Sequence, residues 1–362
     1  MTEDWFTLHH PDLVPSPGIV FYQDRIRRNI AIMVAIAGSP ERLIPHTKTH
    51  KTIEILKLQL EVGITKFKVS TIAEAEMAAM AGAPWVLLAY PVVGPNVARW
   101  HQLMQQYPET SFQALVDNPI TAHAIHTYFG EEKAPVFIDV NNGMDRTGVE
   151  VGNLQSLIDY VHTLPNLELK GLHIYDGHIR NTDFEERKEV VDAAYQRVID
   201  AIQADDNWMI ITGGTPSFTV HALRTGTYLS PGTCLLWDWG YDDLLEEQPF
   251  EWAALIVTRV VSKPAEGLIT IDLGHKSVAA ENPVNRRVKF LNLAEYELLS
   301  QSEEHGVVRV SSWESIEVGD LLYGVPYHIC PTVALHETAT IVENGEVVDE
   351  WTIISRKRKI TI

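Results

Sequence analysis

Short hydrophobic runs recur between residues 43 and 230, and stretches with helical periodicity separate several of them. Alternating strands and helices predict a parallel sheet with crossover helices, and eight repeats favour a closed (β/α)8 TIM barrel over residues 19–250. The predicted strands are Leu43–Thr47, Lys66–Ser70, Trp85–Tyr90, Ser111–Val116, Pro135–Val140, Leu169–Tyr175, Trp208–Thr212 and Tyr228–Ser230. The predicted helices include Ile72–Ala81, Pro119–Tyr128, Leu154–His162 and Phe184–Gln203.

The pattern changes at about residue 250, because no long helical pattern follows and the hydrophobic runs are strand-like. We therefore expect an α/β chain whose barrel is followed by a separate all-β domain over residues 251–362. Residues 1–18 are proline-rich and are expected to pack on this β domain as an irregular arm. Its predicted strands are Glu251–Ser262, Leu268–Asp272, Arg286–Phe290, Val307–Val310, Glu337–Glu343 and Val347–Ser355.

Composition narrows the classes of function. The 362 residues include 29 Lys and Arg against 48 Asp and Glu, a net charge of −19, which argues against a nucleic-acid or anionic-membrane surface. An anionic ligand would then need a local binding site. With Cys234 and Cys330 as its only cysteines, the chain has no disulfide framework. The acidic start lacks a signal pattern, and the most apolar stretch, Trp85–Val93, is shorter than the roughly 20 residues of a spanning helix. A cytoplasmic protein is expected.

Polar residues follow several predicted strands directly, where a TIM barrel carries its active site. Thr212, Gly213, Gly214 and Thr215 follow one strand, and Gly232 with Thr233 follows the next. Successive amides around a glycine pair can hold an anion, and barrels often bind phosphate at these two loops. Tight turns are the alternative. The pair of loops together favours the phosphate of a tightly bound cofactor.

Lys48 follows the first predicted strand, between His46 and the His50-Lys51 pair. Cationic neighbours and partial burial lower the pKa of a lysine and yield the free amine that forms a Schiff base. A solvated basic cluster is the alternative. A zinc site at His46 and His50 is less favoured, because the glutamate of the His-Glu-x-x-His motif is missing.

The segment Pro45–Lys51 resembles the Pro-His-x-Lys-Thr-His-Lys signature of the D-threonine aldolase and D-serine dehydratase family. This family belongs to the fold-type III, alanine-racemase-like enzymes that use pyridoxal phosphate (PLP). The resemblance covers nearly the whole chain in the family's order. Its further motifs are Gly143-x-x-Arg146-Thr147-Gly148, Tyr175-x-Gly177, Gly213-Gly214-Thr215-Pro216, Pro231-Gly232-Thr233 and Pro326-x-His328-x-Cys330-Pro331-Thr332.

The resemblance implies a role for each of these sites. Lys48 would carry the Schiff base with PLP, Arg146 would bind the phenolic oxygen of PLP, and Tyr175 would lie near the pyridine ring. The loops of Thr212–Thr215 and Gly232-Thr233 would hold the phosphate. A head-to-tail homodimer is also implied, in which the β domain of one subunit closes the barrel of the other.

His328 and Cys330 form a candidate metal pair, because residues i and i+2 of a strand face the same side. An incidental histidine beside a buried cysteine is the alternative, but the family's metal pair falls at this place. Within the family, His-x-Cys resembles the zinc D-serine dehydratases, whereas D-threonine aldolases more often show His-x-Asp. A thiolate favours zinc over manganese or magnesium.

Two reactions fit this set of residues. In the favoured one, a D-threonine aldolase reaction, a base removes the hydroxyl proton and a D-β-hydroxy amino acid splits into glycine and an aldehyde. In the alternative, a D-serine dehydratase reaction, Lys48 takes the α-proton and pyruvate and ammonia form. His178 is the candidate hydroxyl base, although the family's histidine falls where this chain has Asn181. An amino-acid racemase and a non-catalytic PLP carrier are more distant alternatives.

Overall fold

The computed structural model describes residues 4–203 and 207–362, so the first three residues of the expected N-terminal arm lie outside it. These residues form two compact units. Of the described residues, the first unit contains 4–32, 49–52 and 233–356, and the second contains 33–48, 53–203, 207–232 and 357–362. Helix α1 (Gln23–Ala37) begins in the first unit and ends in the second. The units change over at Gly232 and Thr233, and the domain boundary expected at residue 250 stays a prediction.

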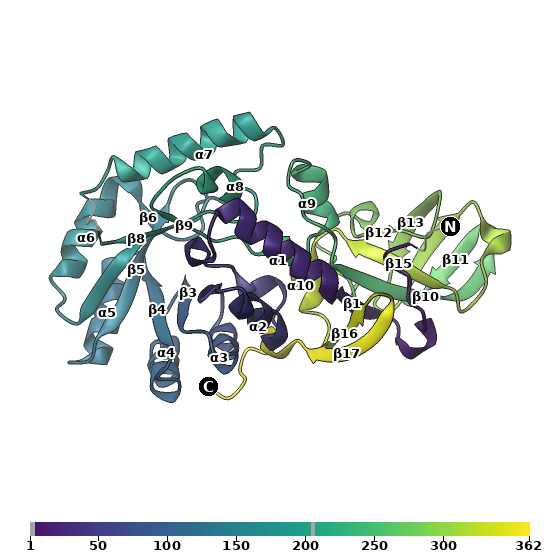
Figure 1. Ribbon diagram of the computed structural model, residues 1–362, viewed down its shortest axis with the longest axis horizontal. Helices are drawn as coiled ribbons and strands as arrows, with labels where there is room; N and C mark the ends of the chain where they lie inside the picture. Colours follow the sequence, from purple (N-terminus) through teal and green to yellow (C-terminus); the bar gives the residue numbers. More distant parts are fainter. Residues whose placement is uncertain (1–3, 204–206) are drawn as a thin grey trace. The chain divides into compact units, whose positions relative to one another are not determined.

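The second unit is built on the predicted parallel sheet (Figure 1). Its neighbouring strands, in order, are β2 (Lys66–Val69), β3 (Trp85–Pro91), β4 (Ser111–Val116), β5 (Ala134–Asn141), β7 (Leu167–Ile174), β8 (Met209–Thr212) and β9 (Thr227–Leu229), with the short β6 (Val149–Glu150) beside β5.

The expected first strand of the barrel is present only as two isolated parallel bridges, which join the two edges of the sheet. Leu43 pairs with Leu229 of β9, and His46 pairs with Lys68 of β2. The N–H of Ile44 donates to the Leu229 carbonyl at 2.8 Å, and the N–H of Lys68 donates to Pro45 at 2.9 Å. Residues 43–46 thus close the sheet, and Lys48 follows immediately.

Helices connect these strands and lie on the outside of the sheet (Figure 1). Side-chain caps begin three of them: Thr71 accepts from the N–H of Glu74, Asn118 from Thr121, and Asp183 from Glu186. Helices α2, α4 and α8 are not among the helices predicted from the sequence. The helices are α2 (Ile53–Glu61), α3 (Ile72–Met80), α4 (Pro95–Gln106), α5 (Pro119–Phe129), α6 (Leu154–His162), α7 (Phe184–Ile199) and α8 (Phe218–Ala222).

The interior of the closed sheet is filled by apolar side chains from β3, β4, β5, β8 and the closing segment 43–46. Each of these side chains is at most 1% exposed, and burying one stabilises the fold by roughly 1.5–3 kcal/mol. They are Ile44, Leu87, Leu115, Phe137 and Ile211.

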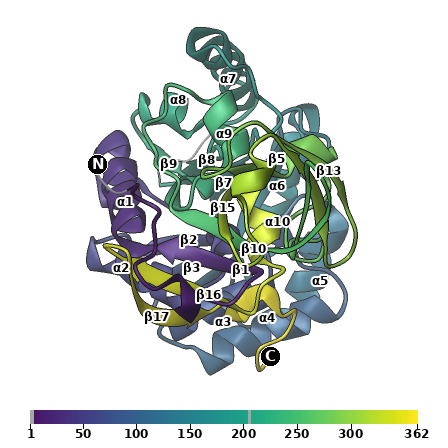
Figure 2. The ribbon, with the colours of Figure 1, turned by 90° about the vertical axis from the view of Figure 1, so that its right-hand side faces the viewer.

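The first unit is a mostly antiparallel sheet (Figure 2). Its main path is β13 (Tyr296–Gln301), β14 (Gly306–Val310), β11 (Leu268–Ile271), β10 (Ala254–Ala265), β1 (Gly18–Tyr22), β16 (Thr338–Glu343) and β17 (Glu346–Thr352). Strand β15 (Leu321–Pro326) pairs with β10 and with β12 (Val288–Phe290). The unit also contains the short helices α9 (Trp239–Leu244) and α10 (Ile329–Val333).

Strand β1 comes from far away in the sequence and lies between two strands of the C-terminal region. It runs antiparallel to β10 and parallel to β16. This strand is not among those predicted from the sequence, and neither are β13 and β15. Phe6, Leu8 and Val14 of the N-terminal arm belong to the same core as the β10 residues Leu255 and Val257. Among the described residues, no helix combines the length and the apolar character needed to cross a membrane.

Candidate active site

Four side chains that follow or lie in different barrel strands surround the ring of Tyr175. The Lys48 ammonium lies 5.9 Å from the ring centroid, and the Arg146 guanidinium carbon lies 5.2 Å from it. The Lys68 ammonium, which the sequence analysis does not name, is also 5.2 Å away. His173 stacks beside the ring, with centroids 6.4 Å apart and planes 9° apart. The structure therefore brings together three of the sequence-predicted residues, Lys48, Arg146 and Tyr175.

Lys68 is buried and belongs to a chain of polar groups inside the barrel. Its Nζ is 3.5 Å from Nε2 of His173, whose Nδ1 is 2.7 Å from a carboxylate oxygen of Asp139. Burial, reinforced by the nearby Lys48 charge, lowers the pKa of Lys68 to about 7. Burial also lowers the pKa of His173, against the opposing effect of its hydrogen bond to Asp139. A lysine that exchanges its proton near neutral pH therefore faces the Tyr175 ring.

The loop that carries Arg146 is fixed by hydrogen bonds at both of its ends. The Asn141 side chain accepts from the N–H groups of Gly143 and Asp145, each at 3.1 Å, and the Thr147 hydroxyl donates to Asp139 at 2.8 Å. Gly148 has φ +104°, and a Cβ there would lie 2.4 Å from the Asn141 nitrogen. Only glycine fits this position, which keeps the loop close to the end of β5.

The Thr212–Thr215 loop packs against the Tyr175 ring. A Cβ on Gly214 would lie 2.8 Å from Tyr175 Cε2, and a Cβ on Gly213 would lie 2.9 Å from Ser217 Oγ. The second predicted phosphate loop lies against this one, because the N–H of Gly232 donates to Thr215 Oγ1 at 3.2 Å. The Thr212 hydroxyl donates to the Tyr228 carbonyl at 3.1 Å.

The expected nest of bare amides is not present at the glycine pair. The N–H of Gly213 donates to the Ile174 carbonyl at 3.0 Å, and the N–H of Gly214 donates to Ser217 Oγ at 3.3 Å. Ser217 in turn donates to Asp176 at 2.5 Å, and Nε2 of His221 is 2.8 Å from the second Asp176 oxygen. Burial would raise the pKa of Asp176, but the contacts with His221 and Ser217 outweigh it and lower that pKa.

Three buried polar atoms at the C-terminal ends of the barrel strands lack a hydrogen-bond partner among the described residues. They are Thr47 Oγ1, Asn142 Oδ1 and Ser230 Oγ. An unsatisfied buried polar group costs about 1–3 kcal/mol, so three at one end of a barrel indicate a place for a polar ligand. These atoms and the tight glycine loop fit a phosphate-bearing cofactor such as PLP.

His178, the candidate base, is exposed and lies over the loop that follows β5. A Cβ on Gly143 would be only 3.0 Å from Nε2 of His178. Position 143 also has φ +122°, so both its backbone conformation and its close approach to His178 favour glycine. The imidazole thus lies beside the loop that carries Arg146.

The candidate metal pair lies in the first unit, and its local structure differs from the expected strand. His328 precedes α10 and Cys330 is inside this helix, so the strand assumed for the pair is wrong. The two side chains nevertheless interact with each other. The Cys330 sulfur is 3.1 Å from the Thr49 hydroxyl and 3.6 Å from that of Thr233, one of the predicted phosphate ligands.

Two carboxylates orient the pair. Nδ1 of His328 is 2.6 Å from Glu281, and Asp238 accepts from the N–H of Ile329 at 3.0 Å. Burial alone would lower the pKa of His328, but Cys330, Asp238 and Glu281 together raise it to about 9. In the part of the chain that the structure describes, no three His, Cys, Asp or Glu side chains are placed to hold a metal ion together. A metal here would need water or substrate as further ligands.

Several polar residues of this region are not among the site residues predicted from the sequence. They include Lys68, His173, Ser217, His221 and Ser230. Lys68 carries the clearest signal in the sequence. It lies between Phe67 and Val69, and all three side chains are at most 2% exposed. A lysine inside a hydrophobic strand of a parallel sheet must be paired within the fold, because both faces of such a sheet are covered.

Two family models match the chain. The model described as alanine racemase, N-terminal domain matches residues 22–237, and the putative serine dehydratase domain matches residues 253–342. A D-threonine aldolase from Arthrobacter sp. is 29% identical over 361 residues, covering 95% of this chain and 93% of the relative. A 3-hydroxy-D-aspartate aldolase from Paracoccus denitrificans (strain Pd 1222) is 28% identical, with 95% and 92% covered.

More distant matches show the same fold. A D-threo-3-hydroxyaspartate dehydratase from Delftia sp. (strain HT23) is 22% identical, covering 93% of this chain and 96% of the relative. The crystal structure of D-threonine aldolase from Filomicrobium marinum superposes with a TM-score of 0.83 at 24% identity, covering 95% of this chain and 96% of that one. Since the match over residues 22–237 spans more than half of the sequence, the chain belongs to the family defined by the alanine racemase N-terminal domain.

Proposed function

We propose that this chain is a PLP- and metal-dependent lyase of D-β-hydroxy amino acids, of the D-threonine aldolase type. The observation that carries the proposal is the set of Lys48, Lys68 and Arg146 around the Tyr175 ring. The relatives favour the aldolase over the dehydratase, because the two aldolases share 28–29% of their residues with this chain and the dehydratase shares 22%.

The residues present fit PLP, and bound PLP supplies an electron sink for charge that develops at the substrate α-carbon. Lys48 would hold the cofactor through its amine, Arg146 would donate to its phenolic oxygen, and Tyr175 would lie against its pyridine ring. The phosphate would lie between the Thr212–Thr215 loop and Gly232-Thr233. Since Gly213 and Gly214 use their amides within the chain, the hydroxyls of Ser230 and Thr47 would be further polar contacts of the phosphate.

The pair of His328 and Cys330 fits a soft divalent ion, and zinc is the ion proposed, with manganese or magnesium as alternatives. A carboxylate partner on the second imidazole nitrogen is usual for metal-binding histidines, and Glu281 is such a partner. A divalent ion bound here supplies a Lewis acid for the β-hydroxyl of the substrate. His178 is the proposed base for the hydroxyl proton. We also propose a homodimer and a cytoplasmic location.

One observation favours the dehydratase as a second candidate. The sulfur of Cys330 lies within hydrogen-bonding distance of the Thr49 and Thr233 hydroxyls, and this environment suits a thiolate that binds zinc. The His-x-Cys pair resembles that of the zinc D-serine dehydratases, so a zinc site here favours the dehydratase. In that reaction the amine of Lys48 would take the α-proton instead of only holding the cofactor.

The experiment offers D-threonine and D-serine separately to the purified enzyme with PLP, loaded in parallel with zinc or manganese. Glycine and acetaldehyde from D-threonine support the aldolase, whereas ammonia and pyruvate from D-serine without glycine support the dehydratase. Lys48→Ala should remove activity and the cofactor absorbance near 410–430 nm, a region typical of PLP bound to a lysine. Lys57→Ala, an exposed lysine of α2, is the matched control. A yellow protein that forms neither product would contradict both candidates and favour a PLP carrier.

A further inference from the structure

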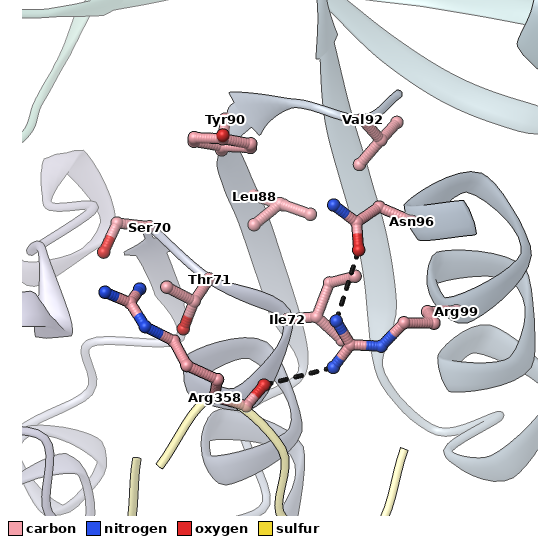
Figure 3. Close-up of a pocket in the computed structure, with 9 residues that line it drawn as sticks. All are labelled: Ser70, Thr71, Ile72, Leu88, Tyr90, Val92, Asn96, Arg99 and Arg358. Atoms are coloured by element: carbon pink, nitrogen blue, oxygen red, sulfur yellow. Dashed lines mark hydrogen bonds between the residues drawn. The ribbon is translucent and has the colours of Figure 1, made fainter. Parts of the chain in front are cut away.

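A pocket of about 200 Å³ lies in the second unit, between the starts of α3 and α4 (Figure 3). It is separate from the Tyr175 cluster, because none of Lys48, Lys68, Arg146 and Tyr175 lines it. Its nine lining residues include two arginines and no carboxylate. They are Ser70, Thr71, Ile72, Leu88, Tyr90, Val92, Asn96, Arg99 and Arg358.

Three hydrogen-bond donors of this pocket have no partner within the described part of the chain. They are the Arg358 guanidinium, the Tyr90 hydroxyl and the Asn96 side-chain N–H2, whose oxygen accepts from Arg99 at 3.2 Å. Figure 3 shows the Arg358 guanidinium beside Ser70 and Thr71, with Asn96 on the opposite wall. Such a set of donors favours an anion, and a guanidinium pairs especially well with a carboxylate.

The floor of the pocket is apolar. The side chains of Ile72, Leu88 and Val92 line it, and they are 6%, 2% and 1% exposed. Free inorganic phosphate would gain nothing from these side chains, whereas a few methylene groups would be removed from water there. The chain carries a net charge of −19, so long-range attraction would not bring an anion to this place and the local donors must hold it.

Arg358 is held over the pocket by its own backbone segment. Arg99 of α4 donates to the main-chain oxygens of Arg358 at 3.2 Å and of Ile362 at 2.8 Å. The buried Glu76 of α3 accepts from the N–H of Thr361 at 3.1 Å. Residues 357–362 are thus fixed to the same two helices that form the pocket, which reduces the ordering cost for a ligand that pairs with Arg358.

We propose that this pocket binds a short-chain aliphatic carboxylate. The carboxylate pairs with Arg358, with the Tyr90 hydroxyl and the Asn96 N–H2 as further donors, and the hydrocarbon part contacts Ile72, Leu88 and Val92. The proposal does not depend on the reaction catalysed at Lys48.

The test is isothermal titration of the PLP-loaded enzyme with butyrate, and with acetate, butyramide and inorganic phosphate as comparisons. Butyrate should bind more tightly than acetate because of the apolar floor, and more tightly than butyramide because of its charge. Loss of a charge-assisted hydrogen bond in Arg358→Gln should weaken butyrate binding about tenfold. Lys359→Gln makes the same change of charge one residue away, outside the pocket, and should alter binding by less than about twofold.

Limited trypsin digestion shows whether butyrate binds at this pocket. The exposed residues Lys357, Arg358 and Lys359 are cleavage sites, and butyrate bound to Arg358 should slow their cleavage. Equal affinity of the wild type and Arg358→Gln, or tight binding without protection of this segment, would overturn the proposal. Phosphate binding as tight as that of butyrate would show that the apolar floor has no role and would equally overturn it.

Discussion

Two buried carboxylate–imidazole pairs of the second unit each have one member at the C-terminal end of β7, but the pairs end in different partners. His173 has Asp139 at Nδ1 and the Lys68 amine at Nε2. His221 has Asp176 at Nε2 and the Arg224 guanidinium at Nδ1, 2.7 Å away. A carboxylate accepts and a guanidinium only donates, so His173 carries its hydrogen on Nδ1 and His221 carries it on Nε2.

The difference separates a pair that ends in a lysine with a lowered pKa from a pair that ends in a serine and an arginine. The Asp139 pair ends in Lys68, whose pKa of about 7 permits titration beside the Tyr175 ring. The Asp176 pair ends in Ser217, which holds the Gly214 amide, and in Arg224, which pairs with Asp192. The same two residue types thus contact a titrating lysine in one pair and fix a loop in the other.

Breaking the pair of Asp176 and His221 should have the largest effect on the free energy of unfolding. Asp176→Ala leaves the buried His221 and Ser217 without their shared acceptor, and removing one partner of a buried pair costs about 3 kcal/mol or more. Urea unfolding measures this loss. Asp192→Ala is the control, because it removes a half-exposed carboxylate from the same network and should cost less than about 1 kcal/mol. Equal losses in the two variants would show that Asp176 does not organise the network.

Removing the Lys68 amine should change how the stability of the fold depends on pH. The pKa of Lys68 falls from 10.5 to about 7 on folding, so between these pH values the unfolded chain binds more protons and stability rises with pH. Lys68→Met should therefore be most stabilising relative to the wild type at or below pH 7. This advantage should decline by up to about 1.4 kcal/mol per pH unit as the pH rises toward 10.

Urea unfolding at pH 6, 7, 8 and 9 measures this difference, and Lys66→Met, a half-buried lysine of the same strand, is the control. A difference between Lys68→Met and the wild type that does not vary with pH would contradict titration of Lys68. In the lyase reaction, the variant should also lose a pH-dependent step near pH 7.

The comparison also shows what the sequence can and cannot predict. The barrel strands are predictable because buried parallel strands are short apolar runs bounded by turns, and motifs at their ends indicate Lys48, Arg146 and Tyr175. The strand β1 is not predictable, because its five residues form a strand only by pairing with β10 and β16, which lie more than 230 residues away. The pairing of His173 with Lys68 is equally non-local, since 105 residues separate them. The metal pair shows a third limit, since two-residue spacing suggests a strand where His328 instead precedes the helix α10 and Cys330 lies inside it.

The smallest expected effect tests the link from Asp176 through Ser217 to the Gly214 amide. The Ser217 hydroxyl accepts from the Gly214 amide and donates to Asp176, so Ser217→Ala should destabilise the fold by about 1 kcal/mol, the usual net contribution of such hydrogen bonds. Thr219→Val is a matched control from α8, because the buried Thr219 hydroxyl has no partner among the described residues and its loss should cost nothing. The freed Gly214 amide would then be available to a phosphate, so Ser217→Ala should lose less stability with PLP bound than without it. An equal loss in both states would place the phosphate away from Gly214 and would leave the Asp176 pair with a purely structural role.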